Sequence, residues 1–151
     1  MPRVEPENFI AAVAANACLM ALDVSPRRIG IAVTEPARTM ALPTKTLIRG
    51  KWEADAATLH QFIQDHRIGG IVIGLPRNLD GSMGPADQSC LTFGRNLDNY
   101  LTERNAALPY TMVDESLTSH EARDILGDRK DTKNMEDQIA ASLILQHFIK
   151  I

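Results

Sequence analysis

The sequence predicts one α/β domain built on a five-stranded mixed sheet with helices on both of its faces. The chain has 151 residues, a length that fits one hydrophobic core and not two. Three strand-like patterns follow one another near the start, as in an antiparallel meander. The later strand-like patterns are separated by helical ones, which implies parallel pairing. We therefore expect an antiparallel three-strand meander extended by two parallel strands.

The first half of the chain should contain two helices and the three strands of the meander. An alanine-rich stretch over 7–17 predicts a short helix, and apolar residues at three- and four-residue spacing predict a second helix over 51–66. Gly69-Gly70 should end that second helix. Pro43 interrupts the third strand and should place it at an edge of the sheet. The three expected strands cover residues 18–24, 29–34 and 39–47.

The second half should alternate strands with helices. Residues 71–75 form a continuous apolar run of the kind found in a strand that is buried on both faces. Pro85 suits the first turn of a helix, where its missing N–H is harmless. Thr118 and Glu121 have the spacing of a capping box, and Gly127 suits the end of the helix that they would open. The other expected elements are a strand at 110–114 and helices at 85–104 and 135–151.

Domain organisation and cellular compartment follow from simple features of the chain. We expect residues 1–17 to form an N-terminal helical extension and residues 18–151 to form a single domain. Cys18 and Cys90 lack metal-ligand or redox spacing and lie in apolar stretches, which is typical of buried, reduced thiols. Acidic residues near the start do not fit a signal peptide, and no apolar run approaches the roughly 18 residues that span a membrane. We therefore expect a cytoplasmic protein with no membrane partner.

The charge balance argues against a generally basic, nucleic-acid-coating surface. The chain has 16 Lys and Arg residues against 19 Asp and Glu residues, which gives a formal net charge of −3. This balance leaves room for a local basic patch. Because hydrophobic residues make up 44% and charged residues 23% of the chain, an intrinsically disordered protein is also excluded.

Carboxylates mark the elements that should meet at one edge of the sheet, where open α/β sheets bind their ligands. Asp23 lies at the C-terminal end of the first strand, and Asp114-Glu115 ends another strand. Because side chains alternate along a strand, only one of Asp114 and Glu115 can face a site shared with Asp23. Asp137 lies in the first turn of the last helix, on the face that should pack on the sheet. Each acid could instead cap a turn or a helix.

A cluster of three carboxylates at one edge would need a compensating cation or bound protons. A site of oxygen ligands without cysteine or clustered histidine suits Mg²⁺ or Mn²⁺ rather than zinc. The four histidines of the chain share no ligand spacing. A magnesium or manganese site of this kind would polarise a phosphodiester and generate hydroxide.

Donors for phosphate are expected around these acids. Residues 74–81 directly follow a strand at the same edge, and Arg77 and Asn78 offer donors there. Arg27 and Arg28 follow Asp23. If these residues form a cationic rim around the acidic centre, they would attract nucleic acid in a salt-dependent way. A plain structural loop and solvated surface charges are the alternative.

Four segments of the sequence together resemble a known bacterial family. They occur in the order of that family and cover nearly everything from about Leu19 to the end of the chain. In this combination the sequence resembles the bacterial pre-16S rRNA nuclease family, also described as Holliday-junction-resolvase-like. The segments are LDVSPRRIGIAV at 22–33, IGLPRNLDGS at 73–82, VDESLT at 113–118 and DQIAASLILQ at 137–146.

The resemblance implies a ribonuclease H-like fold and a metal-dependent nuclease. Its substrate would be the 5′ end of pre-16S ribosomal RNA, Holliday-junction-like branched DNA, or both. The resemblance also implies that Asp23, Glu115 and Asp137 are the catalytic carboxylates and bind the metal ion. Substrate contacts are expected from Arg27, Arg28, Arg77, Asn78, Asp80 and Thr118.

Two positions depart from the pattern of that family. Ser25 stands where glycine is usual in the turn after the first acid, and the change could alter the backbone of that turn. Ser116 stands where arginine usually follows the Asp-Glu pair, so a positive charge is missing near the expected site. Both departures bear on phosphate affinity and on activity.

Two other functions stay open on the sequence alone. Actin-like and sugar-kinase ATPases also begin with an aspartate and a phosphate-binding turn, but they generally need two such domains, and 151 residues supply one. A non-catalytic nucleic-acid-binding factor would keep the fold with reduced activity, as Ser25 and Ser116 allow. A homodimer is expected if the substrate is a two-fold-symmetric junction, because paired cuts need paired sites.

Overall fold

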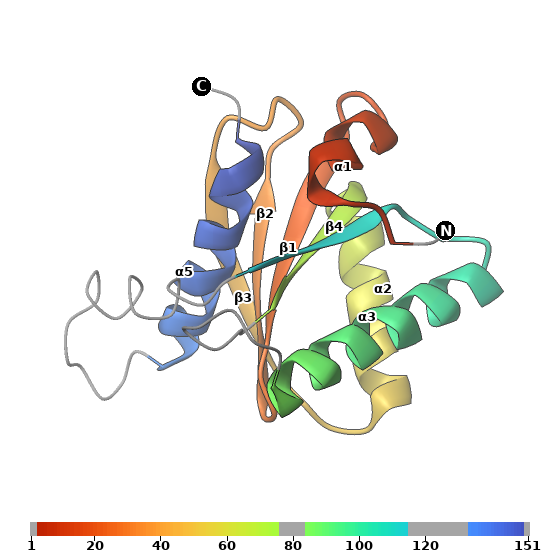
Figure 1. Cartoon of the computed structure of the whole chain (residues 1–151), viewed down its shortest axis with the longest axis vertical. Helices are drawn as coiled ribbons and strands as arrows, with labels where there is room; N and C mark the ends of the chain where they lie inside the picture. The colour runs from red at the N-terminus through yellow and green to blue at the C-terminus, as the bar shows by residue number, and fades with distance from the viewer. Residues whose placement is uncertain (1–2, 76–83, 115–132, 150–151) are drawn as a thin grey trace.

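The computed structural model describes residues 3–75, 84–114 and 133–149, and its elements follow the predicted order (Figure 1). The helices are α1 (Pro6–Ala12), α2 (Trp52–Asp65), α3 (Pro85–Glu103) and α5 (Lys133–Leu145), followed by a short 3₁₀-helix, η1 (Gln146–Phe148). The strands are β1 (Cys18–Val24), β2 (Arg28–Thr34), β3 (Ala41–Ile48), β4 (Ile68–Leu75) and β5 (Tyr110–Asp114).

The five strands form one mixed sheet in the order β3-β2-β1-β4-β5. The β1–β2 and β2–β3 pairs are antiparallel, whereas the β1–β4 and β4–β5 pairs are parallel. The predicted meander with two added parallel strands is therefore confirmed. Pro43 lies in β3 at the sheet edge, as predicted, where a residue without an N–H costs little.

Helices cover both faces of the sheet, so each face has its own hydrophobic core. Alternating residues of β1 separate the two: Met20 and Leu22 point to the core beneath α2 and α3, and Leu19 and Ala21 point to the core beneath α1 and α5. Every residue of β1 is buried because the strand is central and covered on both sides. Figure 1 shows α5 on one side of the sheet and the α2–α3 pair on the other.

The packed faces of the helices follow the spacing of apolar residues in the sequence. In α3 the buried residues Cys90, Phe93, Leu97 and Leu101 recur at three- and four-residue intervals. In α5, small residues lie against the sheet, because Ala140 is 1% exposed and Ala141 is fully buried. The close approach of α5 allows its second turn to reach the β-strands beneath it.

The first helix is shorter than the predicted 7–17. It ends at Ala12, and Val13 is already extended and buried against the sheet. The carbonyl groups of Ala14 and Ala17 accept hydrogen bonds from the Arg38 guanidinium, at 2.7 and 3.0 Å. An alanine-rich stretch favours a helix locally, but these distant contacts hold residues 14–17 in a turn.

The predicted boundaries of two other helices are also wrong. Gly69 and Gly70 do not end α2; the helix stops at Asp65, Arg67 adopts a positive φ of 54°, and both glycines belong to β4. A Cβ atom at Gly70 would lie 2.8 Å from Cζ of Phe9, so the glycine makes room for α1. The last helix begins before the predicted residue 135 and ends at Leu145, where η1 takes over. The helix predicted between Thr118 and Gly127 lies outside the described residues.

Both cysteines are free and buried, as the sequence predicts. Burial raises the pKa of the Cys18 thiol, and the nearby Glu35 carboxylate raises it further. The reactive species is the thiolate, so both effects suppress reaction. We expect both thiols to react slowly with Ellman's reagent in the folded protein and rapidly in denaturant. Fast reaction of the native protein at mildly alkaline pH would contradict this placement.

None of the helices in the described segments is long and apolar enough to cross a membrane.

Candidate active site on the α5 face of the sheet

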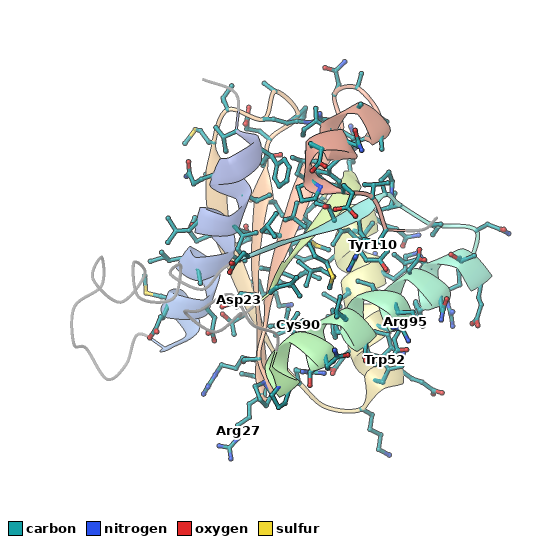
Figure 2. All side chains as sticks on the ribbon, viewed as in Figure 1. Asp23, Arg27, Trp52, Cys90, Arg95 and Tyr110 are labelled. Carbon is teal, nitrogen blue, oxygen red and sulfur yellow. The ribbon has the colours of Figure 1, made fainter. Side chains whose placement is uncertain are left out.

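Asp23 is the acidic residue on the central strand. It is 8% exposed and lies one residue before the end of β1, directly opposite Gly30 of β2. Opposite residues in an antiparallel pair direct their side chains to the same face of the sheet. Ala21, two residues earlier, packs in the core beneath α5, so Asp23 also faces α5. Asp23 is labelled in Figure 2 beside the sheet.

Asp137 reaches the same place from the last helix. A Cβ atom at Gly30 would lie 2.8 Å from the Asp137 Cβ atom and would overlap the Asp137 carbonyl group. Because α5 begins at Lys133, Asp137 lies in its second turn and not in the predicted first turn, and this second turn rests on the backbone of Gly30. Since Gly30 lies opposite Asp23, the structure brings these two predicted carboxylates to one region of the sheet surface.

A hydrogen bond to β3 anchors the same turn of α5. Thr46 lies opposite Gly30 on the outer side of β2, so Asp23, Gly30 and Thr46 form a row across three strands. Gln138 Nε2 donates a hydrogen bond to Thr46 Oγ1 at 3.2 Å. This contact lies next to Asp137 in sequence, and together with the space at Gly30 it holds this turn of the helix over the row.

The two predicted arginines of the β1–β2 hairpin differ in their surroundings. Arg27 is exposed and projects from the turn, as Figure 2 shows. Arg28 is half-buried, and because it precedes Ile29 of the opposite core it lies on the same face as Gly30. The Arg28 Nε atom is buried and has no hydrogen-bond partner within the described part of the chain. Arg28 therefore lies on the same face as Asp23, and Arg27 is exposed at the turn.

Ser25 closes the hairpin without needing the backbone freedom of glycine. Its hydroxyl donates to the Arg28 carbonyl at 2.9 Å, and the Arg28 N–H donates back to Ser25 Oγ at 3.3 Å. Ser25 is not among the described residues with positive φ. The serine that was expected to alter this turn therefore stabilises it through the two hydrogen bonds of its side chain.

The predicted acidic pair is only partly described. Asp114 is exposed and continues the alternation of β5 from Met112, which packs in the core beneath α2 and α3. Asp114 therefore lies on the face opposite to Asp23. The other predicted site residues, Glu115, Arg77, Asn78, Asp80 and Thr118, lie outside the described residues.

Comparison with known proteins identifies the family. The family model for RuvX, described as Holliday junction resolvase, matches residues 17–151. The chain belongs to the RuvX family. Its relatives include a protein of Roseobacter denitrificans, 40% identical over 92% of this chain and 86% of its own length, and one of Paracoccus denitrificans, 41% identical over 93% and 88%. Both are named "Putative pre-16S rRNA nuclease".

RuvX membership makes the chain a nuclease, a hydrolase that acts on the ester bonds of nucleic acid. Its fold resembles that of Thermus thermophilus RuvC, solved in complex with a Holliday junction substrate, with a TM-score of 0.55 and 10% sequence identity. This match covers 87% of the present chain and 94% of RuvC. The predicted ribonuclease H-like fold is therefore confirmed.

Three features of this RuvX-family site do not follow from the sequence reasoning. Gly30 provides the space for α5, and a lone glycine within a strand pattern is the signal that could have shown it. The Thr46–Gln138 hydrogen bond joins residues that are far apart in the chain, so no local sequence pattern predicts it. The difference between Arg27 and Arg28 depends on where β2 begins, which a run of two arginines cannot fix.

Proposed function

We propose that this RuvX-family chain is a divalent-metal-dependent endonuclease whose catalytic carboxylates are Asp23, Glu115 and Asp137. The observation that carries the proposal is the meeting of Asp23 and Asp137 across Gly30, although they come from opposite ends of the domain. The position of Asp114 on the other face supports Glu115 as the third member, because only one of the pair can join Asp23.

The donor set fits a hard divalent cation such as Mg²⁺ or Mn²⁺. Asp23 and Asp137 offer carboxylate oxygens, and in the described segments no group of three His, Cys, Asp or Glu residues forms an alternative metal site. When bound, the ion would polarise the scissile phosphodiester and lower the pKa of a water molecule. The chain itself would orient the phosphate through Arg28, whose buried Nε atom needs a partner, and would shield the reaction beneath α5.

The substrate we propose first is the 5′ end of pre-16S ribosomal RNA, because relatives about 40% identical over most of the chain carry that name. Branched DNA is the second candidate, and the description of the matching family supports it. Arg27 and Arg28 would hold the strand, with Arg77, Asn78, Asp80 and Thr118 as further proposed contacts. Either substrate would place the enzyme in the bacterial cytoplasm.

One substrate panel tests the proposal and separates its candidates. Purified protein is incubated with a four-way DNA junction, a single-stranded RNA and a ribosomal-RNA precursor fragment, each with Mn²⁺ and each with EDTA. We expect cleavage in the Mn²⁺ arms only, with the precursor fragment cut at a defined position. Preferred cutting of the junction would select branched DNA instead.

Three further measurements decide the remaining alternatives. Salt-dependent RNA binding that survives Asp137→Asn, without cleavage in Mg²⁺ or Mn²⁺, would indicate a non-catalytic binding factor. Calorimetric titration with ATP and Mg²⁺ tests the ATPase-like alternative, for which we expect no binding. If the junction is the substrate, we also propose a homodimer, and sedimentation analysis should then give twice the monomer mass.

A further inference from the structure

A second cleft lies at the same end of the sheet but on the α2–α3 face. It has a volume of about 500 Å³ and lies between the β1–β2 turn, the start of α2 and the first half of α3. The side chains that matter here are Arg49, Trp52, Phe93 and Asn96, with Val24–Pro26 forming one wall. The size suits one base with part of its nucleotide rather than a long peptide or a duplex.

The aromatic wall of this cleft is held by several contacts. The rings of Trp52 and Phe93 meet edge to face, with centroids 5.4 Å apart and an interplanar angle of 81°. The Arg49 guanidinium lies 5.5 Å from the centroid of the Phe93 ring and donates a hydrogen bond to the Ser25 carbonyl at 2.8 Å. Phe93 is buried, whereas Trp52 is only partly buried. Trp52 is therefore the aromatic surface that a ligand can reach.

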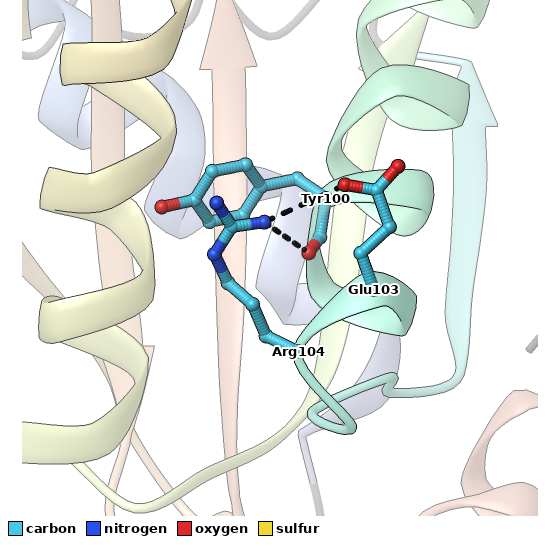
Figure 3. Close-up of polar contacts among 3 residues, drawn as sticks. All are labelled: Tyr100, Glu103 and Arg104. Atoms are coloured by element: carbon cyan, nitrogen blue, oxygen red, sulfur yellow. Dashed lines mark hydrogen bonds and ion pairs between the residues drawn. The ribbon is translucent and has the colours of Figure 1, made fainter.

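The charge of the lining favours an anionic ligand. Among the described residues that line the cleft, Arg49 is the single charged side chain. A neighbouring groove shares Trp52 and Asn96 but carries Glu53 and Glu103. Its Arg104 guanidinium stacks 3.5 Å from the Tyr100 ring centroid, donates to the Tyr100 carbonyl and pairs with the Glu103 carboxylate, which offsets its charge (Figure 3). The Arg49 contacts described above are to a ring and a neutral carbonyl group, so they leave its charge uncompensated. The cleft at Arg49, and not the groove, therefore complements nucleic acid.

The hairpin connects this cleft directly to the candidate active site. Asp23 faces α5, and Ser25, two residues later, lines the cleft on the other face. At about 3.3 Å per residue the two positions are roughly 7 Å apart along the backbone, a separation that neighbouring nucleotides of an extended strand can bridge. Arg27 projects outward from the same turn (Figure 2). A strand bound at Asp23 can thus pass over the turn and place a base in the cleft.

We propose that the cleft binds an unpaired nucleobase of the strand whose phosphate lies at Asp23, with the base stacked on Trp52. That the base belongs to the strand bound at Asp23 rests on the proposed nuclease function. That the cleft binds a base is inferred from the residues of the cleft alone. Aromatic side chains that stack bases are sequence-tolerant and require an unstacked base. The cleft would therefore select substrates with single-stranded or distorted segments over continuous duplex.

Trp52 allows a direct test, because it is the one tryptophan of the chain. Its fluorescence is followed while a single-stranded RNA oligonucleotide, the same sequence as DNA, or the fully paired duplex is added in EDTA. Occupancy is measured in parallel from the anisotropy of a labelled oligonucleotide. We expect saturable quenching by the single strands and little quenching by the duplex at equal occupancy. Single-strand binding without any change in Trp52 fluorescence would overturn the proposal.

Two variants and a control separate base binding from a folding defect. Trp52→Leu should weaken single-strand binding by roughly five- to 150-fold, which corresponds to base stacking worth about 1–3 kcal/mol. Ser89→Leu, at an exposed position of α3, should fill the cleft and weaken binding while thermal unfolding stays unchanged. Gln61→Ala is an exposed change on α2 away from the cleft and should bind as the wild type does. Wild-type affinity in both Trp52→Leu and Ser89→Leu would overturn the proposal.

The outcome also distinguishes this inference from the proposed function. Cleavage of the substrate panel without quenching of Trp52 would leave the nuclease assignment intact and remove the base-binding cleft. Quenching by single strands without cleavage in any arm would support the cleft and contradict the nuclease assignment.

Discussion

Asp23→Asn is expected to abolish metal-dependent cleavage while leaving thermal unfolding nearly unchanged. The substitution keeps the size and shape of a side chain that is 8% exposed, so packing against α5 is preserved. It removes one negative charge from the proposed metal site. Such a site supplies several kcal/mol of transition-state stabilisation, so the rate should fall about 10³-fold or more. The measurement is the single-turnover cleavage rate on the preferred substrate, together with a melting curve.

Asp114→Asn is the matched control for this experiment. Asp114 is also an aspartate near the end of a strand in the same sheet, but it is exposed and lies on the opposite face. We expect it to cleave at close to the wild-type rate. Retained cleavage by Asp23→Asn, or equal losses in both variants, would exclude Asp23 as a catalytic carboxylate.

Gly30→Ala should damage both stability and activity. The added Cβ atom would overlap the Asp137 carbonyl group, and backbone cannot move aside as cheaply as the end of a flexible side chain. Overpacking of this kind costs about 3 kcal/mol. For a chain of this length that loss corresponds to a fall of roughly 6–12 °C in the melting temperature. Cleavage should fall as well, because α5 must shift and carry Asp137 away from Asp23.

Gly50→Ala tests whether the effect is specific to the helix contact. A Cβ atom at Gly50 would lie 4.0 Å from the Asp55 Oδ1 atom, which is ordinary van der Waals contact. We expect a change in melting temperature within about 2 °C, as for most surface substitutions. If Gly30→Ala melts and cleaves like the wild type, α5 does not rest on Gly30.

Much of the sheet could be predicted because runs of apolar residues in the local sequence mark its strands. Residues 18–24 form a mostly apolar run and residues 71–75 a continuous one, and both belong to the buried centre of the sheet. Pro43 correctly indicated an edge strand. The placement of Asp137 on the packed face of the last helix also followed from its spacing to Ala140, Ala141 and Ile144, all of which are buried. Local periodicity is sufficient wherever burial alone decides the structure.

The remaining features depend on contacts between distant parts of the chain. The end of α1 is set by Arg38, which binds carbonyl groups more than twenty residues earlier in the sequence. Gly69 and Gly70 belong to a strand because α1 and the turn that follows it need the space above them. The distinct positions of Arg27 and Arg28 depend on the register of β2 against β1. Helix and strand propensities cannot predict such contacts, because they describe only residues that are neighbours in the sequence.

The resting of α5 on Gly30 also affects the order in which the protein matures. Translation delivers all five strands before it delivers Lys133, the first residue of α5. Until α5 docks, the row of Asp23, Gly30 and Thr46 is uncovered and Asp137 is away from Asp23. An enzyme of this design gains its proposed full set of carboxylates only as its last helix docks. A chain that ends before Asp137 would therefore lack one of the three proposed carboxylates.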